Sequence, residues 1–132
     1  MSRINDFLTE AEVFYLATCD GAQPKIRPIG AHIEMDGKVL IGIGQHKEVY
    51  KQMQANPLVE IAAYKPNGHW LRYTGRAVFE TDPKYADTMI AAMHLQELYN
   101  EQNGNKLAVF HLEDATALDI TVMGPGVDLL AE

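Results

Sequence analysis

Two short segments of this chain bring together cations, glycines and a predicted helix start. The first reads Lys25-Ile26-Arg27-Pro28-Ile29-Gly30 and the second reads Gly44-Gln45-His46-Lys47. Cations beside a helix N-terminus suit a phosphate group, because the free backbone N–H groups and the helix dipole already favour negative charge there. The sequence therefore predicts a site for a phosphorylated small molecule.

Each side chain of these segments has a possible role in such a site. Arg27 can donate bidentate hydrogen bonds to a phosphate. Pro28 has no backbone N–H to donate, which is typical of a residue at the edge of a sheet. Lys47 adds a charge at the helix start, and Gly42 and Gly44 leave room for the backbone to approach a ligand. The plainer alternatives stay open. Arg27 can be a solvated surface arginine, and residues 45–47 can be an ordinary helix start.

Trp70, the only tryptophan, follows a predicted tight turn at 66–68. Its ring could cover an aromatic ring system by stacking. The commoner fate of a lone tryptophan is a place in the core or in a dimer interface, and the sequence leaves both interpretations open.

Several kinds of chemistry are disfavoured by the residues present. The five histidines show no metal-ligand spacing and there is no cysteine cluster, so we expect no metal site. Ser2 is the only serine, which argues against serine-hydrolase chemistry. Cys19 lies in an apolar segment without a nearby base, and we interpret it as a buried structural thiol.

Composition indicates one compact domain spanning residues 1–132, with 47% hydrophobic residues. The net charge of -7 argues against nucleic-acid binding. A single cysteine and the absence of a signal peptide predict a cytoplasmic protein. No apolar run approaches the roughly 18 residues of a membrane span, so we expect no membrane association.

Hydrophobic periodicity predicts a mainly β fold with inserted helices. Ser2 should cap a first helix, Asn56-Pro57 should end a second helix over 46–55, and Asp82-Pro83 should begin a third that runs to about 93. A further helical segment is expected over 95–100. Strands are expected over 13–19, 25–35, 38–43, 58–64, 70–80, 107–112 and 117–123, with Gly124-Pro125-Gly126 ending regular structure. Short strands joined by tight turns, about six in the final sheet, favour an antiparallel barrel.

The order of these pieces resembles the pyridoxamine 5′-phosphate oxidase-like, FMN-binding split-barrel superfamily, and most closely its small nitroimidazole-resistance-related flavoproteins. The resemblance covers residues 4–122. It rests on segments 14–18, 24–28, 36–40, 47–50, 56–60 and 70–77, which read FYLAT, PKIRP, DGKVL, KEVY, NPLVE and WLRYTGRA.

The resemblance implies a six-stranded antiparallel split barrel that pairs as a homodimer with FMN at the subunit interface. By position, Arg27 and Lys47 match the family's phosphate-binding cations. The strand beside the flavin would continue through Pro28, Ile29 and His32, and the segment around the ribityl phosphate would include Gly42, Gln45 and His46. Trp70 would reach the flavin from the partner subunit.

The same resemblance leads to the functional hypotheses. The leading hypothesis is an FMN-dependent oxidoreductase that passes electrons from a reduced nicotinamide or similar donor to a small acceptor, with no side chain required as acid or base. A non-catalytic flavin-binding or flavin-sensing module is the alternative, as is a barrel that binds another planar cofactor such as a deazaflavin or haem. Pyridoxamine phosphate oxidase activity itself is not expected, because the sequence stops soon after Gly126 without the segment that would hold pyridoxal phosphate.

Overall fold

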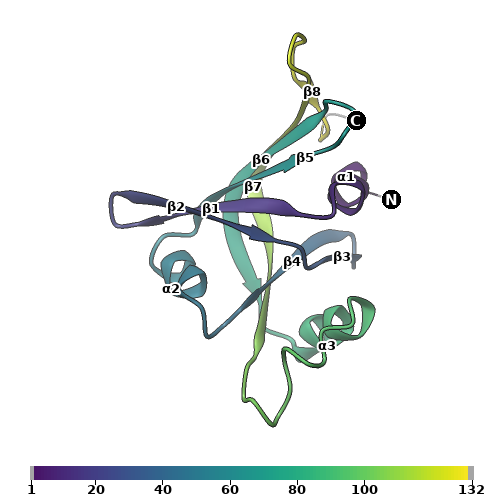
Figure 1. Cartoon of the computed structure of the whole chain (residues 1–132). Helices are drawn as coiled ribbons and strands as arrows, with labels where there is room; N and C mark the ends of the chain where they lie inside the picture. Colours follow the sequence, from purple (N-terminus) through teal and green to yellow (C-terminus); the bar gives the residue numbers. More distant parts are fainter. Residues whose placement is uncertain (1, 131–132) are drawn as a thin grey trace.

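The structure is a computed structural model that describes residues 2–130; residues 1, 131 and 132, the ends of the expected domain, lie outside it. Its elements follow one another as shown in Figure 1. They are α1 (Arg3–Ala11), β1 (Phe14–Asp20), β2 (Gln23–Ile29), β3 (His32–Met35), β4 (Lys38–Gly44), α2 (Glu48–Ala55), β5 (Leu58–Tyr64), β6 (Trp70–Glu80), α3 (Pro83–Ala92), β7 (Leu107–Ile120) and β8 (Val127–Asp128).

The helix starts follow from local capping chemistry. The Ser2 hydroxyl accepts hydrogen bonds from the backbone N–H groups of Ile4 and Asn5, and the Asp82 carboxylate accepts one from that of Lys84. Both caps confirm the sequence prediction, because each satisfies N–H groups that a helix start leaves without a partner. Helix α2 begins at Glu48, two residues later than predicted, with Lys47 at the cap position.

All strands pair antiparallel, in the order β2-β1-β5-β6-β7-β4-β3, with β8 paired to β7. Strands β2 and β3 lie at opposite ends of this order, yet only Gly30 and Ala31 separate them in the chain. Two residues span at most about 10 Å between the flanking Cα atoms, so the sheet must curl until its edges meet. This is the predicted antiparallel split barrel, with seven strands in the path and an eighth short strand instead of six.

The prediction of one strand over 25–35 is wrong. The chain pairs with β1 as far as the Phe14–Ile29 partners, leaves the ladder at Gly30, and pairs with β4 from His32 onward. Changing partners at this point is what lets one continuous segment close the barrel.

Three predictions near the C-terminal part of the chain are also corrected. The two final strands are one long strand, β7, whose pairing with β6 contains a β-bulge between Thr74 and Arg76. Residues 95–100 form turns instead of a helix, after His94 adopts a positive φ of 57°. Regular structure also continues past Gly126, because β8 follows it.

Each of the three helices packs against two strands of the curled sheet. Helix α1 packs against β3 and β5, α2 against β1 and β4, and α3 against β3 and β7. Figure 1 shows the β7–β8 hairpin at one end of the molecule and α3 with the following loop at the other.

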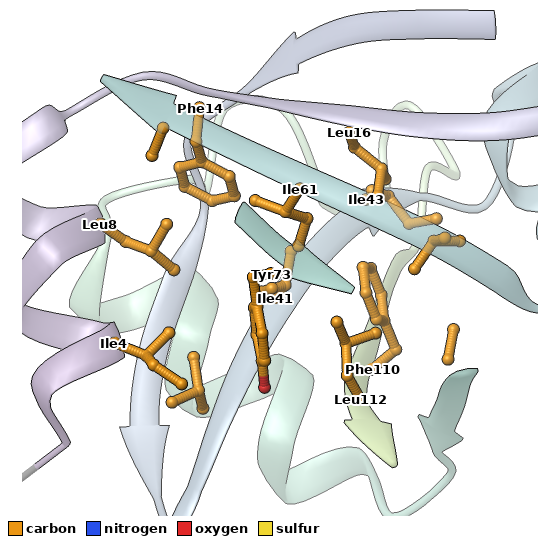
Figure 2. Close-up of a cluster of buried hydrophobic side chains, with 14 of the residues drawn as sticks. Ile4, Leu8, Phe14, Leu16, Ile41, Ile43, Ile61, Tyr73, Phe110 and Leu112 are labelled. Carbon is orange, nitrogen blue, oxygen red and sulfur yellow. The ribbon is translucent and has the colours of Figure 1, made fainter. Parts of the chain in front are cut away.

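The core fills the barrel between its strands and α1. Figure 2 shows side chains from α1, β1, β4, β5, β6 and β7 converging on one another. They include Ile4, Leu8, Phe14, Leu16, Ile41, Ile43, Ile61, Tyr73, Phe110 and Leu112. A second cluster of buried residues joins α3 to β4 and β7 through Leu40, Tyr85, Met89, Leu107 and Val109. In the described part of the chain, no helix has the length and apolarity needed to cross a membrane.

Candidate functional site

Arg27 is held by a closed set of hydrogen bonds to β1 and α2. Its Nη1 donates to the Thr18 hydroxyl at 2.7 Å and to the Leu16 carbonyl at 3.2 Å, and its Nη2 donates to Gln52 Oε1 at 2.8 Å. The Thr18 hydroxyl donates in turn to Gln52 Oε1 at 2.6 Å. Thr18 and Gln52 are both buried, so their polar atoms depend on these bonds. The three side chains form a rigid unit, which we call the Arg27 clamp.

The strand register explains the position of the guanidinium. Arg27 lies opposite Leu16, and partners in an antiparallel pair project to the same side of the sheet. Arg27 therefore points to the inner side, toward α2, and is half-buried. Burial lowers the pKa of the Arg27 guanidinium, but an arginine starts so far above neutrality that the group stays cationic.

Lys47 supplies the second cation, at the start of the same helix. Its side chain is exposed and, within residues 2–130, forms no ion pair or hydrogen bond. Gln52 follows five positions later, which is about 7.5 Å along a helix axis. Helix α2 thus has a free ammonium and unpaired N–H groups at its start, and the clamped guanidinium beside its second turn.

Gln45 and His46 form the connection between β4 and α2. Both side chains are exposed. The Gln45 backbone N–H donates to the Lys106 carbonyl at 2.9 Å, and the His46 ring lies 6.3 Å from that of Tyr99. The segment is thereby tied to the loop that follows α3.

Other side chains lie beside both glycines of this region. A Cβ on Gly42 would lie 2.5 Å from the Met89 sulfur, so the side chain of α3 fills that space. A Cβ on Gly44 would lie 2.7 Å from the His46 ring. The buried Met89 side chain accounts for the glycine at position 42, whereas the exposed His46 ring beside Gly44 is free to turn away.

Pro28, Ile29 and His32 lie where the barrel closes. Pro28 is exposed opposite Tyr15 on the outer side, and Ile29 packs against the core. His32 is buried beneath α1, with Nδ1 2.8 Å from Asn5 Oδ1. Because an amide oxygen only accepts, we assign the proton to Nδ1. Burial lowers the pKa of His32, which favours the neutral ring.

Trp70 begins β6 on the outer face of the sheet, half-buried between its partners Tyr64 and Ile120. The Arg72 guanidinium lies 4.9 Å from the centre of its ring. Tyr15, Tyr64 and Trp70 line a hollow of about 240 Å³ on this face. Tyr15 and Tyr64 are 44% and 60% exposed, so a broad aromatic surface faces outward. We call this surface the outer aromatic face.

The predicted site residues therefore divide between the two faces of the sheet. Arg27 points inward, whereas Pro28 and Trp70 lie on the outside. Lys47 is associated with Arg27 because Lys47 begins α2 and Arg27 is bonded to Gln52 of the same helix. Sequence reasoning missed the partners in the clamp, Thr18 and Gln52. Both carried a signal, since Thr18 continues the buried alternation of Phe14 and Leu16, and a polar side chain on a buried face requires a partner.

Metal binding is not suggested by the arrangement. Among residues 2–130, no group of three or more histidine, cysteine, aspartate or glutamate side chains is placed to hold a metal ion.

Comparison with known proteins gives a consistent result. Residues 1–122 match the family described as pyridoxamine 5′-phosphate oxidase. The chain is similar to the crystal structure of a NimC/NimA family protein from Clostridium acetobutylicum, with 33% identity and a TM-score of 0.87 over 96% of this chain and 88% of that one. The search of curated proteins gave no match.

Two more distant structures share the fold. One is a pyridoxamine 5′-phosphate oxidase-related, FMN-binding protein from Nostoc punctiforme, with 16% identity and a TM-score of 0.58 over 87% of this chain and 78% of that one. The other is a haem-binding protein from Mycobacterium smegmatis, with 13% identity and a TM-score of 0.71 over 94% of this chain and 55% of that one. The match over residues 1–122 and the 33% identical relative show that the chain belongs to the pyridoxamine 5′-phosphate oxidase-like split-barrel superfamily.

Proposed function

We propose that the chain is a flavoprotein that binds FMN and acts as an oxidoreductase. The observation that carries the proposal is the convergence of two cations on one short helix. Arg27 is fixed against the side of α2, and the Lys47 ammonium is free at its start. Family membership adds that similar chains bind flavins or related planar cofactors, as the names of the Nostoc and Mycobacterium proteins state.

The residues fit the charge of a flavin phosphate. The guanidinium still has N–H groups beyond those that donate to Thr18, Leu16 and Gln52, because five donors are available on an arginine. The Lys47 ammonium and the first N–H groups of α2 add donors of the same sign. Bound FMN would supply the hydride and electron transfer, and the chain would contribute position and electrostatics.

The division of the predicted residues between two faces supports a homodimer. One chain offers the phosphate-binding cations on its inner side and Trp70 on its outer aromatic face. In a dimer formed through that face, the partner's Trp70 could reach a flavin held by the first chain. Burying the outer aromatic face would also remove exposed apolar area from water, which favours association.

Electron transfer would need no acid or base from the protein. A reduced nicotinamide or similar donor would reduce the flavin, and a small acceptor would reoxidise it. The half-buried free thiol of Cys19 suits a reducing compartment, so we also place the protein in the cytoplasm.

The test is an absorbance spectrum of the purified protein followed by anaerobic addition of NADH or NADPH. We expect the bands of an oxidised flavin and their bleaching by a reductant. A spectrum without flavin, even after incubation with FMN, would refute flavin binding. A flavin that no nicotinamide or chemical reductant bleaches would refute the redox role.

Dimer formation has its own test. We expect a dimer in sedimentation velocity, and Tyr15→Glu/Tyr64→Glu should convert it to monomer by placing charges on the outer aromatic face. A wild-type protein that is monomeric while loaded with flavin would refute this part of the proposal.

Haem is the second candidate, favoured by the likeness to the haem-binding protein from Mycobacterium smegmatis. The same spectrum separates the cofactors, because haem gives a Soret band and an oxidised flavin does not. A deazaflavin would be separated from FMN by native mass spectrometry. Bound, reducible flavin without turnover on a panel of acceptors would favour a flavin-sensing module over an enzyme.

A further inference from the structure

A large cleft lies away from the three side chains of the Arg27 clamp. It is a cleft of about 790 Å³ between the start of α2, the end of β6, α3 and the loop that leads into β7. Sites for small molecules have volumes of about 300–1,000 Å³, so the cleft is large enough for a whole organic ligand.

Aromatic rings form part of its walls. Tyr50 comes from α2, Phe79 from β6 and Tyr99 from the loop, and all three are partly exposed. Tyr50 and Phe79 pack edge to face, with ring centres 5.2 Å apart and planes at 76°. Aromatic faces gathered in this way attract a cation through their quadrupoles.

The charged groups lining the cleft are predominantly acidic. Four carboxylates line it, those of Glu80, Asp82, Asp87 and Glu101, against one ammonium from Lys106. Two of the four are already engaged.

Glu80 forms an ion pair with Lys38 and contacts His111, and Asp82 caps α3. Asp87 and Glu101 are exposed and have no hydrogen bond or ion pair among residues 2–130. Their charges remain available to a ligand.

The loop wall is held in shape before any ligand arrives. The Asn100 side chain donates to the Gln96 carbonyl at 2.8 Å, and that of Asn103 donates to the Leu98 carbonyl at 3.1 Å. The Asn105 backbone donates to Asn103 Oδ1 at 2.9 Å. Because these bonds fix the loop that carries Tyr99 and Glu101, little ordering is left for binding to require.

We propose that this cleft, which Arg27 and Lys47 do not line, is a second ligand site and that it binds an organic cation: a protonated amine or quaternary ammonium with an apolar body. The apolar body would lie against Tyr50, Phe79 and Tyr99, and the charge would face Asp87 and Glu101. A phosphate-bearing ligand does not suit the cleft, because four acidic residues and a single lysine line it.

The experiment uses the purified protein with whatever cofactor it retains. Choline and its neutral isostere 3,3-dimethylbutan-1-ol are titrated by calorimetry, alongside benzyltrimethylammonium and phenylacetate as a cation and an anion with an aromatic body. We expect each cation to bind at least tenfold more tightly than its counterpart. Binding of the cations should weaken as salt is added, since the carboxylates lie near the surface.

Paired variants locate the site. Asp87→Asn/Glu101→Gln should weaken benzyltrimethylammonium binding at least threefold, and Tyr99→Leu should weaken it without changing the charge. The matched control is Asp20→Asn/Glu12→Gln, which removes two exposed acids away from the cleft and should leave affinity unchanged. Circular dichroism and the melting temperature verify that each variant is folded.

Three results would overturn the proposal: no cation binds, choline binds no better than its isostere, or the control pair weakens binding as much as the cleft pair. The proposal stands independently of the flavin. Cofactor loading is read from absorbance, so loss of flavin binding and loss of cation binding are separate outcomes.

Discussion

The Arg27 clamp makes a specific prediction for Thr18→Val, which removes one hydroxyl and keeps the shape of the side chain. The hydroxyl accepts from the Arg27 guanidinium and donates to Gln52 Oε1. Thr18 is 2% exposed, so water cannot replace either bond. Arg27 keeps its bonds to the Leu16 carbonyl and to Gln52. The variant therefore loosens the guanidinium without releasing it.

The size of the effect follows from the bonds that are lost. A hydrogen bond to a charged group contributes about 1.5–3 kcal/mol and a neutral one about 0.5–1.5 kcal/mol. The added buried methyl offsets about 0.8 kcal/mol. We expect the free energy of unfolding to fall by about 1–4 kcal/mol. A looser guanidinium should weaken FMN binding by about three- to tenfold, or up to about 1.4 kcal/mol.

The assay compares FMN with riboflavin, which has the same ring system and no phosphate. FMN affinity should fall while riboflavin affinity stays the same, because Arg27 is assigned to the phosphate. Urea unfolding gives the stability change. Thr9→Val is the control, because its exposed hydroxyl donates to the Asn5 carbonyl within α1, lies 3.5 Å from His32 Nε2, and has no hydrogen bond to the Arg27 clamp. Equal losses of FMN and riboflavin affinity, or unchanged stability, would contradict the assigned role of the clamp.

Three further predictions test other positions. Lys47→Ala should weaken FMN binding about tenfold and leave riboflavin binding and stability unchanged, because its ammonium is exposed and has no partner within residues 2–130; an equal loss of riboflavin would contradict this. Burial lowers the pKa of His32, so the unfolded state binds more protons as pH falls through about 6.5. Unfolding free energy should fall over that range, and His32→Asn should flatten the fall in urea titrations at several pH values. Gly42→Ala should destabilise the protein by about 1–3 kcal/mol by forcing a Cβ to within 2.5 Å of the Met89 sulfur. Gly30→Ala is its control in thermal melts, since the nearest atom to that Cβ is 3.5 Å away.

The fold was largely predictable because local signals agreed with one another. The capping residues Ser2 and Asp82 placed two helix starts, and the gap between the strands predicted over 25–35 and 38–43 fell at the turn between β3 and β4. The break of 25–35 into two strands was not predictable from periodicity. The segment stays extended on both sides of Gly30, and only the change of pairing partner divides it.

The candidate site was predicted in part. Sequence identified Arg27 and Lys47 as cations near a helix, and the structure brings Arg27 to that helix through Gln52. The sequence could not reveal that three protein acceptors already bind the Arg27 guanidinium, because these acceptors lie on two other elements, β1 and α2. The predicted approach of a ligand to Gly42 and Gly44 stays a prediction, and in the structure Met89 and His46 are the nearest side chains to a Cβ at these positions.

The two proposed sites have opposite charge and share one structural element, the connection from β4 to α2. Arg27 and Lys47 do not line the acidic cleft, whereas Gln45 and Tyr50 do. Gln45 lines the cleft while its neighbour Lys47 caps α2. Carboxylates at the cleft repel a phosphate, and the two cations repel an ammonium group, so each site disfavours the ligand of the other. If both ligands bind, a substitution at Lys47 should change FMN affinity alone, and one at Asp87 should change cation affinity alone.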